Sequence, residues 1–265
     1  MTLIKETKWR AKLETNKVNT TRPSIPLLNA HWRYLIVINY QINSALLKPL
    51  VPPGTELDYY QKKTFISLVG FLFQNTKLFG LVPMFPFQNF EEINLRFYVR
   101  KKVGNEIRRA VCFIREIVPY APIAWGARVL YNEPYVAYPT GHLILQKDVS
   151  NPKKRYECTY EWKIGGKWVG LTAQTTGNPQ PLRKKSIEEF ILEHYWGYTL
   201  QKDGSVKEYR VQHEPWRYWN NPKVAVDKAV HSFYGGRFSA ALNRKPHSAF
   251  VAEGSPVSIY TGRKV

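Results

Sequence analysis

Cysteine is scarce in this sequence, and long apolar segments are absent. The chain of 265 residues has two cysteines, Cys112 and Cys158, and neither stands in a spacing typical of metal ligands. The pattern indicates neither a disulfide framework nor a zinc site. No apolar run approaches the roughly 18 residues of a membrane-spanning helix, and the first residues lack the apolar core of a signal peptide. We therefore predict a cytoplasmic protein that does not enter a membrane.

Recognisable cofactor and nucleophile motifs are also missing. The sequence has no His-Glu-x-x-His pair, no phosphate-binding loop, no Rossmann glycine pattern and no serine nucleophile elbow. Zinc hydrolysis and nucleotide-dependent chemistry therefore lack support. We predict neither a metal nor a cofactor.

Acidic residues are few relative to basic ones. The chain has 39 Lys and Arg against 20 Asp and Glu, a formal net charge of +19. Such a charge attracts nucleic acid, acidic surfaces or anionic metabolites. The basic residues stand in short runs at expected turns and strand ends: Lys62-Lys63, Arg100-Lys101-Lys102, Lys153-Lys154-Arg155 and Arg183-Lys184-Lys185. Because no helix carries a basic stripe, solvated turns are the simpler interpretation, and nucleic-acid or anionic-surface binding is the alternative function.

Strands dominate what is present. Aromatic residues make up 14% of the chain and hydrophobic residues 44%, which is typical of a folded globule. Strand-like segments occur at 32–42, 63–73, 91–100, 106–117, 135–146, 155–164 and 167–173. Turn signals at Gly104-Asn105, Gly165-Gly166 and Asp203-Gly204 separate neighbouring strands in the manner of hairpins. The sequence therefore predicts a mainly β protein with a mostly antiparallel sheet.

Helices are fewer and peripheral. A capping box at 186–189 begins one helix, which Gly197 can end. Pro222 at a first helical position predicts a second helix over 221–233. A short helix is expected from Ser44 to before Pro49, and another within 119–130. We predict one domain over 1–265, with an N-terminal extension over 1–25 and a surface linker over 174–185.

The segment at 91–99 alternates between polar and apolar residues. Its polar positions are Glu92, Asn94, Arg96 and Tyr98, and apolar residues lie between them. Side chains two apart on a strand share one face. Such a face can be solvated, or it can line a cavity, where a carboxylate, an amide, a guanidinium and a phenol would orient a small anionic or carbonyl-containing ligand.

Motifs spread along the chain carry a family resemblance. They are His31-Trp32-Arg33, LLKPLVPPGTELD at 46–58, INLRFYV at 93–99, GARVLYNEPY at 126–135 and HEPW at 213–216. In this combination the sequence resembles the YqjF-like family of uncharacterised proteins, in the acetoacetate decarboxylase-like superfamily. The resemblance implies a large curved antiparallel sheet that closes into a cone or partial barrel around a central cavity. Superfamily members carry out their chemistry inside that cavity.

The same resemblance bears on the reaction. Decarboxylases of the superfamily form a Schiff base with a lysine that a second lysine activates. When this sequence is aligned with the decarboxylase motif, Arg128 and Pro134 match its arginine and proline. The positions of the two motif lysines are occupied by Tyr135 and Val136. Neither side chain can form an imine, so acetoacetate decarboxylation is not expected. Glu92 resembles the cavity-facing glutamate of these enzymes, which favours a cavity over solvent.

We therefore predict a site in two parts. The proton-handling residues are Glu92 and Tyr135, and the ligand-binding residues are Asn94, Arg96, Tyr98 and Arg128. Two alternatives remain open: Arg128 can instead form a buried salt bridge to Glu116 or Glu133, and Tyr135 can simply fill the cavity. His142, His31 and His213 are better explained as structural histidines.

The predicted function is that of a small-molecule-binding protein, or of a lyase-like or hydrolytic enzyme without Schiff-base chemistry. Its ligand would be an anionic or carbonyl-containing metabolite. A protein whose cavity is filled by its own side chains, leaving only an interaction role, is a further alternative. The sequence leaves the oligomeric state open, a homo-oligomer included.

Overall fold

The computed structural model describes residues 25–147 and 155–265. The predicted N-terminal extension therefore lies outside the described residues, apart from Ile25. The same holds for Lys153 and Lys154 of one basic run.

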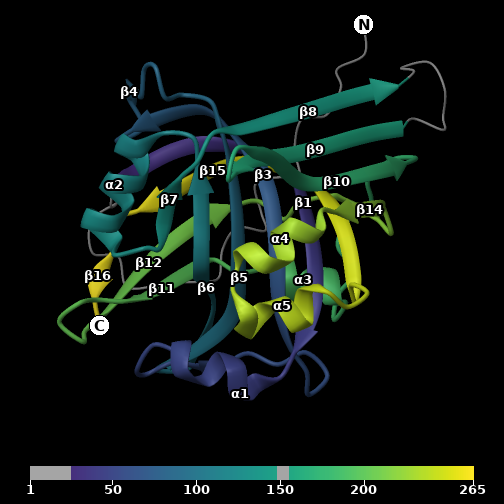
Figure 1. The fold of residues 1–265 in the computed structure, drawn as a ribbon. Helices are drawn as coiled ribbons and strands as arrows, with labels where there is room; N and C mark the ends of the chain where they lie inside the picture. The colour runs from purple at the N-terminus through teal and green to yellow at the C-terminus, as the bar shows by residue number, and fades with distance from the viewer. Residues whose placement is uncertain (1–24, 148–154) are drawn as a thin grey trace, which may run out of the picture.

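A twelve-stranded sheet forms the body of the molecule (Figure 1). Its main path runs β13 (Tyr218–Asn220), β15 (Ser248–Tyr260), β1 (Pro26–Ile42), β3 (Thr64–Leu78), β5 (Phe90–Val103), β6 (Glu106–Val118), β11 (Trp196–Leu200), β12 (Val206–His213) and β16 (Arg263–Lys264). The short strands β2 (Glu56–Leu57), β4 (Val82–Pro83) and β7 (Tyr135–Ala137) pair with β5, β3 and β6. Since β12 also pairs with β15, seven strands form a closed ring: β15, β1, β3, β5, β6, β11 and β12. The predicted mainly β fold with a curved, closing sheet is confirmed.

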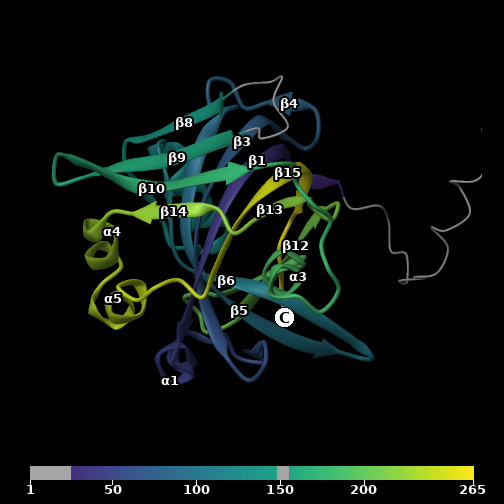
Figure 2. The same ribbon diagram turned by 90° about the vertical axis from the view of Figure 1, so that its right-hand side faces the viewer.

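A second sheet lies against the outside of the ring. It has four antiparallel strands in the order β14 (Lys223–Val226), β10 (Lys167–Thr176), β9 (Arg155–Ile164) and β8 (Thr140–Lys147). The helices α4 (Lys228–Phe233) and α5 (Gly236–Leu242) follow β14 on the same side of β1 (Figure 2). Tyr160 and Trp162 of β9 pack with Ile93 and Leu95 of β5 in one core cluster. The apolar face of the 91–99 segment therefore points to the second sheet.

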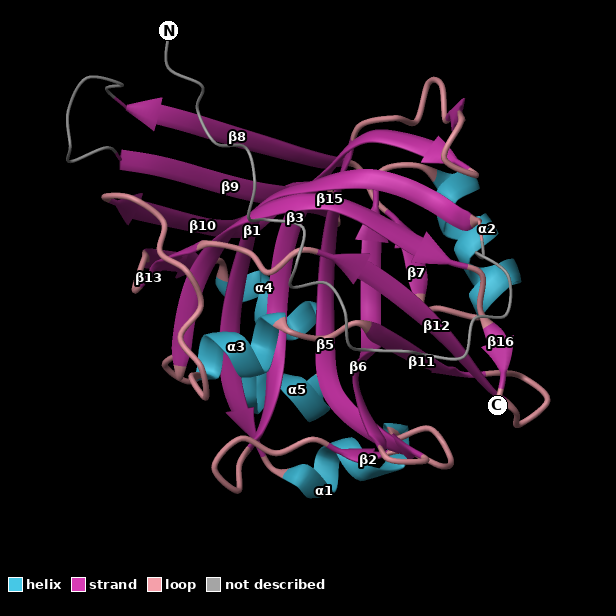
Figure 3. Ribbon diagram, turned by 180° about the vertical axis from the view of Figure 1, so that it is seen from behind, coloured by secondary structure: helices cyan, strands magenta, loops and turns pink. Residues whose placement is uncertain are grey.

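The remaining helices lie elsewhere around the ring. Viewed from behind, α3 (Ile187–Leu192) lies in front of the ring strands, while α4 and α5 lie behind them (Figure 3). Phe190 and Ile191 of α3 pack with Tyr98 in the second core cluster. The other helical segments are α1 (Ser44–Leu47), which a 3-10 turn at Lys48–Leu50 continues, and α2 (Ala121–Tyr131). None of the helices within 25–147 and 155–265 has the length and apolar character needed to cross a membrane.

Most predicted elements are present, and four differ. Residues 223–226 form β14 rather than part of a helix, because they complete the edge of the second sheet beside β10, and α4 begins only at Lys228. The segment 135–146 is divided into β7 and β8, which belong to different sheets. The predicted linker begins inside a strand, since residues 174–176 belong to β10.

The helix that starts at the capping box also ends earlier than predicted. Ser186 Oγ accepts a hydrogen bond from the Glu189 amide, but α3 stops at Leu192, and Gly197 lies in β11. A Cβ atom on Gly197 would lie 2.1 Å from Cζ of Tyr209. The glycine is required there by the close approach of the Tyr209 ring, not by the end of a helix.

Candidate functional site

The polar face of β5 is buried. Glu92, Asn94 and Tyr98 are at most 3% exposed, and Arg96 is 9% exposed. Their strand neighbours are Ser67, Val69 and Phe71 of β3, which face the same way. The solvated interpretation of this face is therefore wrong. Both faces of β5 are covered: the apolar face by the second sheet, and the polar face by the interior of the ring. The four polar side chains are therefore buried.

Glu92 is the centre of a hydrogen-bonded group. Its Oε2 accepts a bond of 2.8 Å from the Tyr135 hydroxyl, and its Oε1 accepts one of 3.0 Å from Asn94 Nδ2. The sheet register brings the three together: in β6, Glu116 lies opposite both Asn94 of β5 and Tyr135 of β7. Asn132 ends α2 with a positive φ of 55°, which turns the chain toward β7. Tyr135, 43 positions along the chain from Glu92, thus shares one buried site with Glu92 and Asn94.

A second buried carboxyl lies in the same interior. Glu133 Oε1 accepts hydrogen bonds from the Thr199 hydroxyl at 2.5 Å and the Tyr209 hydroxyl at 2.8 Å. Burial raises the pKa of Glu133 to about 7, although these bonds lower it, and the charge of Glu92 raises it further. Glu133 therefore holds a proton for part of the time near neutral pH.

The three carboxyl groups act on one another. Burial raises the pKa of Glu92 to about 7, against the opposing effect of the Asn94 and Tyr135 bonds and of the Arg96 charge. Burial and the charges of Glu133 and Glu92 raise the pKa of Glu116 well above its usual value. Carboxyls that titrate near neutral pH are suited to giving and taking protons. The interior of the ring therefore has the equipment for acid–base chemistry.

We expect the Glu92→Gln variant to be more stable than the wild type at pH 8 by about 1–3 kcal/mol, and similar to it at pH 5. The folded pKa of Glu92, about 7, lies above its usual value of 4.5. The stability that its protonated form contributes is therefore present at low pH and lost as the pH rises through about 7. Urea unfolding at a series of pH values measures the difference. If the free energy of unfolding depended on pH in the same way for both proteins, the prediction would be wrong.

Asn94 allows this substitution without a lost hydrogen bond. Its Oδ1 is buried and has no hydrogen-bond partner. Rotating the Asn94 amide would let Oδ1 accept from the amide of the introduced glutamine, while the Tyr135 hydroxyl still donates to the oxygen of that glutamine. The variant therefore changes charge more than packing.

Arg96 lies inside the ring without an ionic partner. Its Nε is buried and has no hydrogen-bond partner, and the salt bridges seen among the described residues do not include Arg96. The guanidinium lies 5.8 Å from the centre of the Tyr98 ring. The Tyr98 hydroxyl, 2.5 Å from Ser67 Oγ, belongs to a separate chain of bonds that continues to Asn39. Arg96 is thus a buried cation with an unpartnered Nε, and the acid whose pKa responds to its charge is Glu92.

Arg128 does not join these residues. It is exposed on α2, which lies at the outer edge of the ring (Figure 3), and its Nη1 donates 2.8 Å to the main-chain oxygen of Tyr135. It forms neither of the two buried salt bridges considered as alternatives, to Glu116 or Glu133. This hydrogen bond holds the main chain of β7. Arg128 therefore does not lie in the interior beside Glu92, as the predicted site required.

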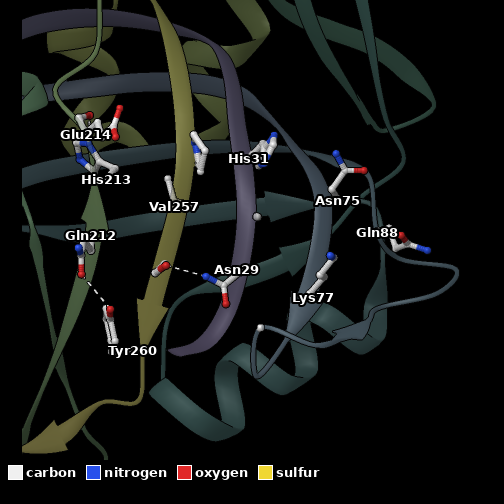
Figure 4. Close-up of a pocket in the computed structure, with 14 residues that line it drawn as sticks. Asn29, His31, Asn75, Lys77, Gln88, Gln212, His213, Glu214, Val257 and Tyr260 are labelled. Carbon is white, nitrogen blue, oxygen red and sulfur yellow. Dashed lines mark hydrogen bonds between the residues drawn. The ribbon is translucent and has the colours of Figure 1, made fainter. Parts of the chain in front are cut away.

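The three histidines considered from the sequence also lie outside the Glu92 group. His142 Nδ1 is 2.5 Å from Glu91 Oε1, in a pair that is 41% exposed on the histidine side. His31 and His213 line a pocket of about 760 Å³ between β1, β3, β12 and β15 (Figure 4). Neither Glu92 nor Tyr135 lines this pocket.

One of these histidines, His213, is influenced by the charge of Arg96. Its ring stacks on Trp216 with 4.1 Å between ring centres. Burial lowers the pKa of His213, and the positive charge of Arg96 contributes to the lowering. His213 therefore lies both at the outer pocket and within electrostatic reach of the interior.

Sequence reasoning missed several interior residues. Glu116 and Glu133 were considered only as partners of Arg128, and Tyr209 and His194 were not singled out for the site. Glu133 stands two residues before Tyr135 in the GARVLYNEPY motif, so its neighbourhood could have been noticed. Tyr209 shows no local signal, because only the pairing of β11 with β12 places it opposite Gly197.

The fold is similar to that of known enzymes. It resembles acetoacetate decarboxylase from Legionella pneumophila with a TM-score of 0.61 and 14% identity, over 96% of this chain and 93% of that one. It also resembles the enduracididine biosynthesis enzyme MppR, in a structure complexed with pyruvate, with a TM-score of 0.62 and 12% identity over 94% and 92% of the chains. The ring of strands and its covering sheet therefore define an acetoacetate decarboxylase-like fold.

Within that fold class, the chain belongs to DUF2071, a family described as an uncharacterized conserved protein, whose model matches residues 29–256. Uncharacterized protein YqjF of Bacillus subtilis (strain 168) is 24% identical over 194 residues, which are 72% of this chain and 74% of YqjF. The family resemblance predicted from the motifs is confirmed.

Proposed function

We propose that the protein binds a small metabolite carrying a carboxylate and a carbonyl group inside the ring of strands, and transfers a proton to or from it. Arg96 holds the carboxylate in this proposal, and Glu92 and Tyr135 handle the proton. The observation that carries the proposal is the buried guanidinium of Arg96, which is 9% exposed and whose Nε has no hydrogen-bond partner.

Electrostatics support an anionic ligand. A buried charge without a partner costs several kcal/mol, so such groups are normally paired. Glu92 compensates only in part, because its pKa of about 7 leaves it protonated for much of the time near neutral pH. A ligand carboxylate on the guanidinium would supply the missing charge through two parallel hydrogen bonds.

The neighbouring groups support proton transfer. A general acid or base works best when its pKa is close to the working pH, and burial raises the pKa of Glu92 to about 7. Burial and the charges of Glu116 and Glu92 also raise the pKa of Tyr135 well above its usual value, so the phenol keeps its proton. Glu92 would therefore act as the base, and Tyr135 as a hydrogen-bond donor to it or to a ligand oxyanion.

Schiff-base chemistry has no support in this interior. The imine mechanism needs a buried primary amine, and no lysine is buried in the described parts of the chain. The reaction we favour is therefore of a lyase-like or hydrolytic type in which side chains move protons without a covalent intermediate.

Isothermal titration calorimetry of the full chain tests the proposal. The probes are pyruvate, which the related MppR structure contains, and its uncharged amide, pyruvamide. We expect pyruvate to bind and the amide to bind at least about tenfold more weakly, because only the acid pairs with Arg96. Borohydride added to the pyruvate complex should leave the mass of the protein unchanged.

Two results would count against the proposal. Equal binding of pyruvate and pyruvamide would remove Arg96 from the site, and an adduct trapped by borohydride would establish the amine chemistry that the proposal excludes. Acetate and 3-oxo acids extend the panel, and a chain that binds none of these acids is not the small-acid binder proposed here.

A further inference from the structure

His194 is a buried histidine that the Glu92 group does not use. It lies between α3 and β11, and its side chain is 2% exposed. The ring packs against Tyr98 with 4.8 Å between ring centres and against the edge of Phe190 at 5.8 Å. The imidazole is thus held in place by two aromatic rings inside the second core cluster.

Neither nitrogen of His194 has a hydrogen-bond partner. The nearest acid is Asp58, whose Oδ2 is 3.9 Å from Nε2, and that same oxygen already accepts a bond of 2.8 Å from Arg109 Nε. Buried polar groups normally find a partner, so an orphaned pair of imidazole nitrogens calls for an explanation. At 3.9 Å Asp58 is within ion-pair distance of His194 but beyond the reach of a hydrogen bond, so both imidazole nitrogens stay without a hydrogen-bond partner.

Arg96 and His194 are both neighbours of the Tyr98 ring, and the charge of Arg96 acts on the imidazole. The guanidinium is 5.8 Å from the centre of Tyr98, and the imidazole is 4.8 Å from it. Three buried nitrogen atoms have no hydrogen-bond partner here: Nε of Arg96, and Nδ1 and Nε2 of His194. A guanidinium and an imidazole that both lack partners beside one ring are suited to share a single ligand, and the group they can share is an anion.

We propose that His194 and Arg96 together hold the anionic group of the ligand, and that His194 takes up one proton when the anion binds. The inference rests on the proposed function, since it assigns a second residue to the same carboxylate. His194 contacts the ligand in this arrangement, while Glu92 and Tyr135 face its carbonyl end.

The charges around His194 give the direction of the proton transfer. Burial lowers the pKa of His194 to about 4; Asp58 raises it, and Arg109 on β6 and Arg96 on β5 lower it. The phenol of Tyr98, also on β5, packs against the imidazole. The free histidine is therefore neutral, and an added anion shifts its pKa upward. Binding must then be accompanied by proton uptake at pH values between about 4 and the raised pKa of the complex.

Calorimetry in buffers of different ionisation enthalpy counts the protons taken up. Glu92 titrates near pH 7, so the experiment uses the Glu92→Gln background at about pH 5.5, where a histidine with a raised pKa is charged. We expect pyruvate to bind with uptake of close to one proton. The further change His194→Gln should abolish the uptake and weaken binding by about 10- to 100-fold, because a hydrogen bond to a charged group is lost.

His231→Gln is the matched control, since His231 lies on α4, on the other side of the ring strands, and bonds to Asn243. It should change neither affinity nor proton uptake. An NMR titration of the free protein adds a readout that needs no ligand: Arg96→Met should raise the pKa of His194, because a neighbouring positive charge is removed.

The outcomes separate the two proposals. If no acid of the panel binds to the wild type, the proposed function and this inference both fail. If pyruvate binds and His194→Gln leaves affinity and proton uptake unchanged, the inference fails while the proposed function stands. A titration of His194 that Arg96→Met does not move would also overturn the inference.

Discussion

Replacing Arg96 by methionine is expected to raise the free energy of unfolding by about 1–2 kcal/mol and to weaken pyruvate binding severely. The two effects have one cause. In the absence of ligand the guanidinium is a buried charge whose Nε has no hydrogen-bond partner, and a similarly shaped apolar side chain removes that cost. With ligand present, the loss of a buried ion pair reduces affinity by about 30-fold or more. Urea unfolding and calorimetry on the same preparation measure both quantities.

Arg100→Met is the control on the same strand. Arg100 lies two strand repeats beyond Arg96, but its side chain is 41% exposed and pairs with the exposed Glu56. Exposed pairs contribute about 0–1 kcal/mol, so this variant should bind pyruvate like the wild type and be no more stable. A stabilisation of the same size at both positions would mean that apolar substitution in general is responsible, and not the unpaired charge of Arg96.

The Glu208→Ala variant is expected to lose about 3–5 kcal/mol of unfolding free energy, the largest destabilisation we predict. Glu208 is 1% exposed and accepts hydrogen bonds from Arg108 Nη1 at 2.7 Å, the Tyr198 hydroxyl at 2.6 Å and Arg263 Nη2 at 3.1 Å. Without Glu208, the largely buried Arg108, 11% exposed, keeps only the ion pair with the exposed Glu106. Urea unfolding at pH 7 measures the loss.

The pH dependence of that loss has a definite sign. Burial raises the pKa of Glu208, but the bonds from Tyr198 and Arg108 outweigh it, and the pKa ends below its usual value. The stability from these bonds is therefore present above the unfolded pKa and disappears as the pH falls through the lower folded value. The difference in the free energy of unfolding between the wild type and Glu208→Ala should therefore become smaller at acidic pH.

Glu106→Ala serves as the matched control for this position. Glu106 pairs with the same Arg108, at 3.1 Å, but it is 52% exposed. Its removal should cost no more than about 0.5 kcal/mol. Equal losses for Glu106→Ala and Glu208→Ala would show that burial of the partner is not what makes the Glu208 pair strong.

Local sequence patterns predicted the strands well and the helices less well. Hairpin turns at Gly104-Asn105 and Gly165-Gly166 join β5 to β6 and β9 to β10 as expected, because positive φ angles at these glycines suit tight turns. The proline at 222 was misleading. Residues 223–226 pair with β10, and that long-range pairing prevails over the weak local preference for a helix.

The sequence by itself determined the composition of the polar face of β5, since alternation alone places Glu92, Asn94 and Arg96 on one side of a strand. It did not determine what lies opposite them. Near the hairpin turn at Gly104, Val103 pairs with Glu106. If that register continued without interruption along β5 and β6, Arg115 would lie opposite Asn94.

Only the tertiary structure decided that Glu116 takes that place. The register of β6 shifts by one residue at the bulge between Leu95 and Arg96, which brings Glu116 opposite Asn94 and puts Arg115 opposite Leu95, with its guanidinium bonded to the main-chain oxygen of Phe233. A one-residue shift moves a side chain to the other face of a sheet. The physical reason is thus the two-residue period of a strand. Because of this single bulge, the carboxyl group of Glu116 lies near Glu92 in place of the Arg115 guanidinium. The bulge thereby determines the charge of the interior at this point.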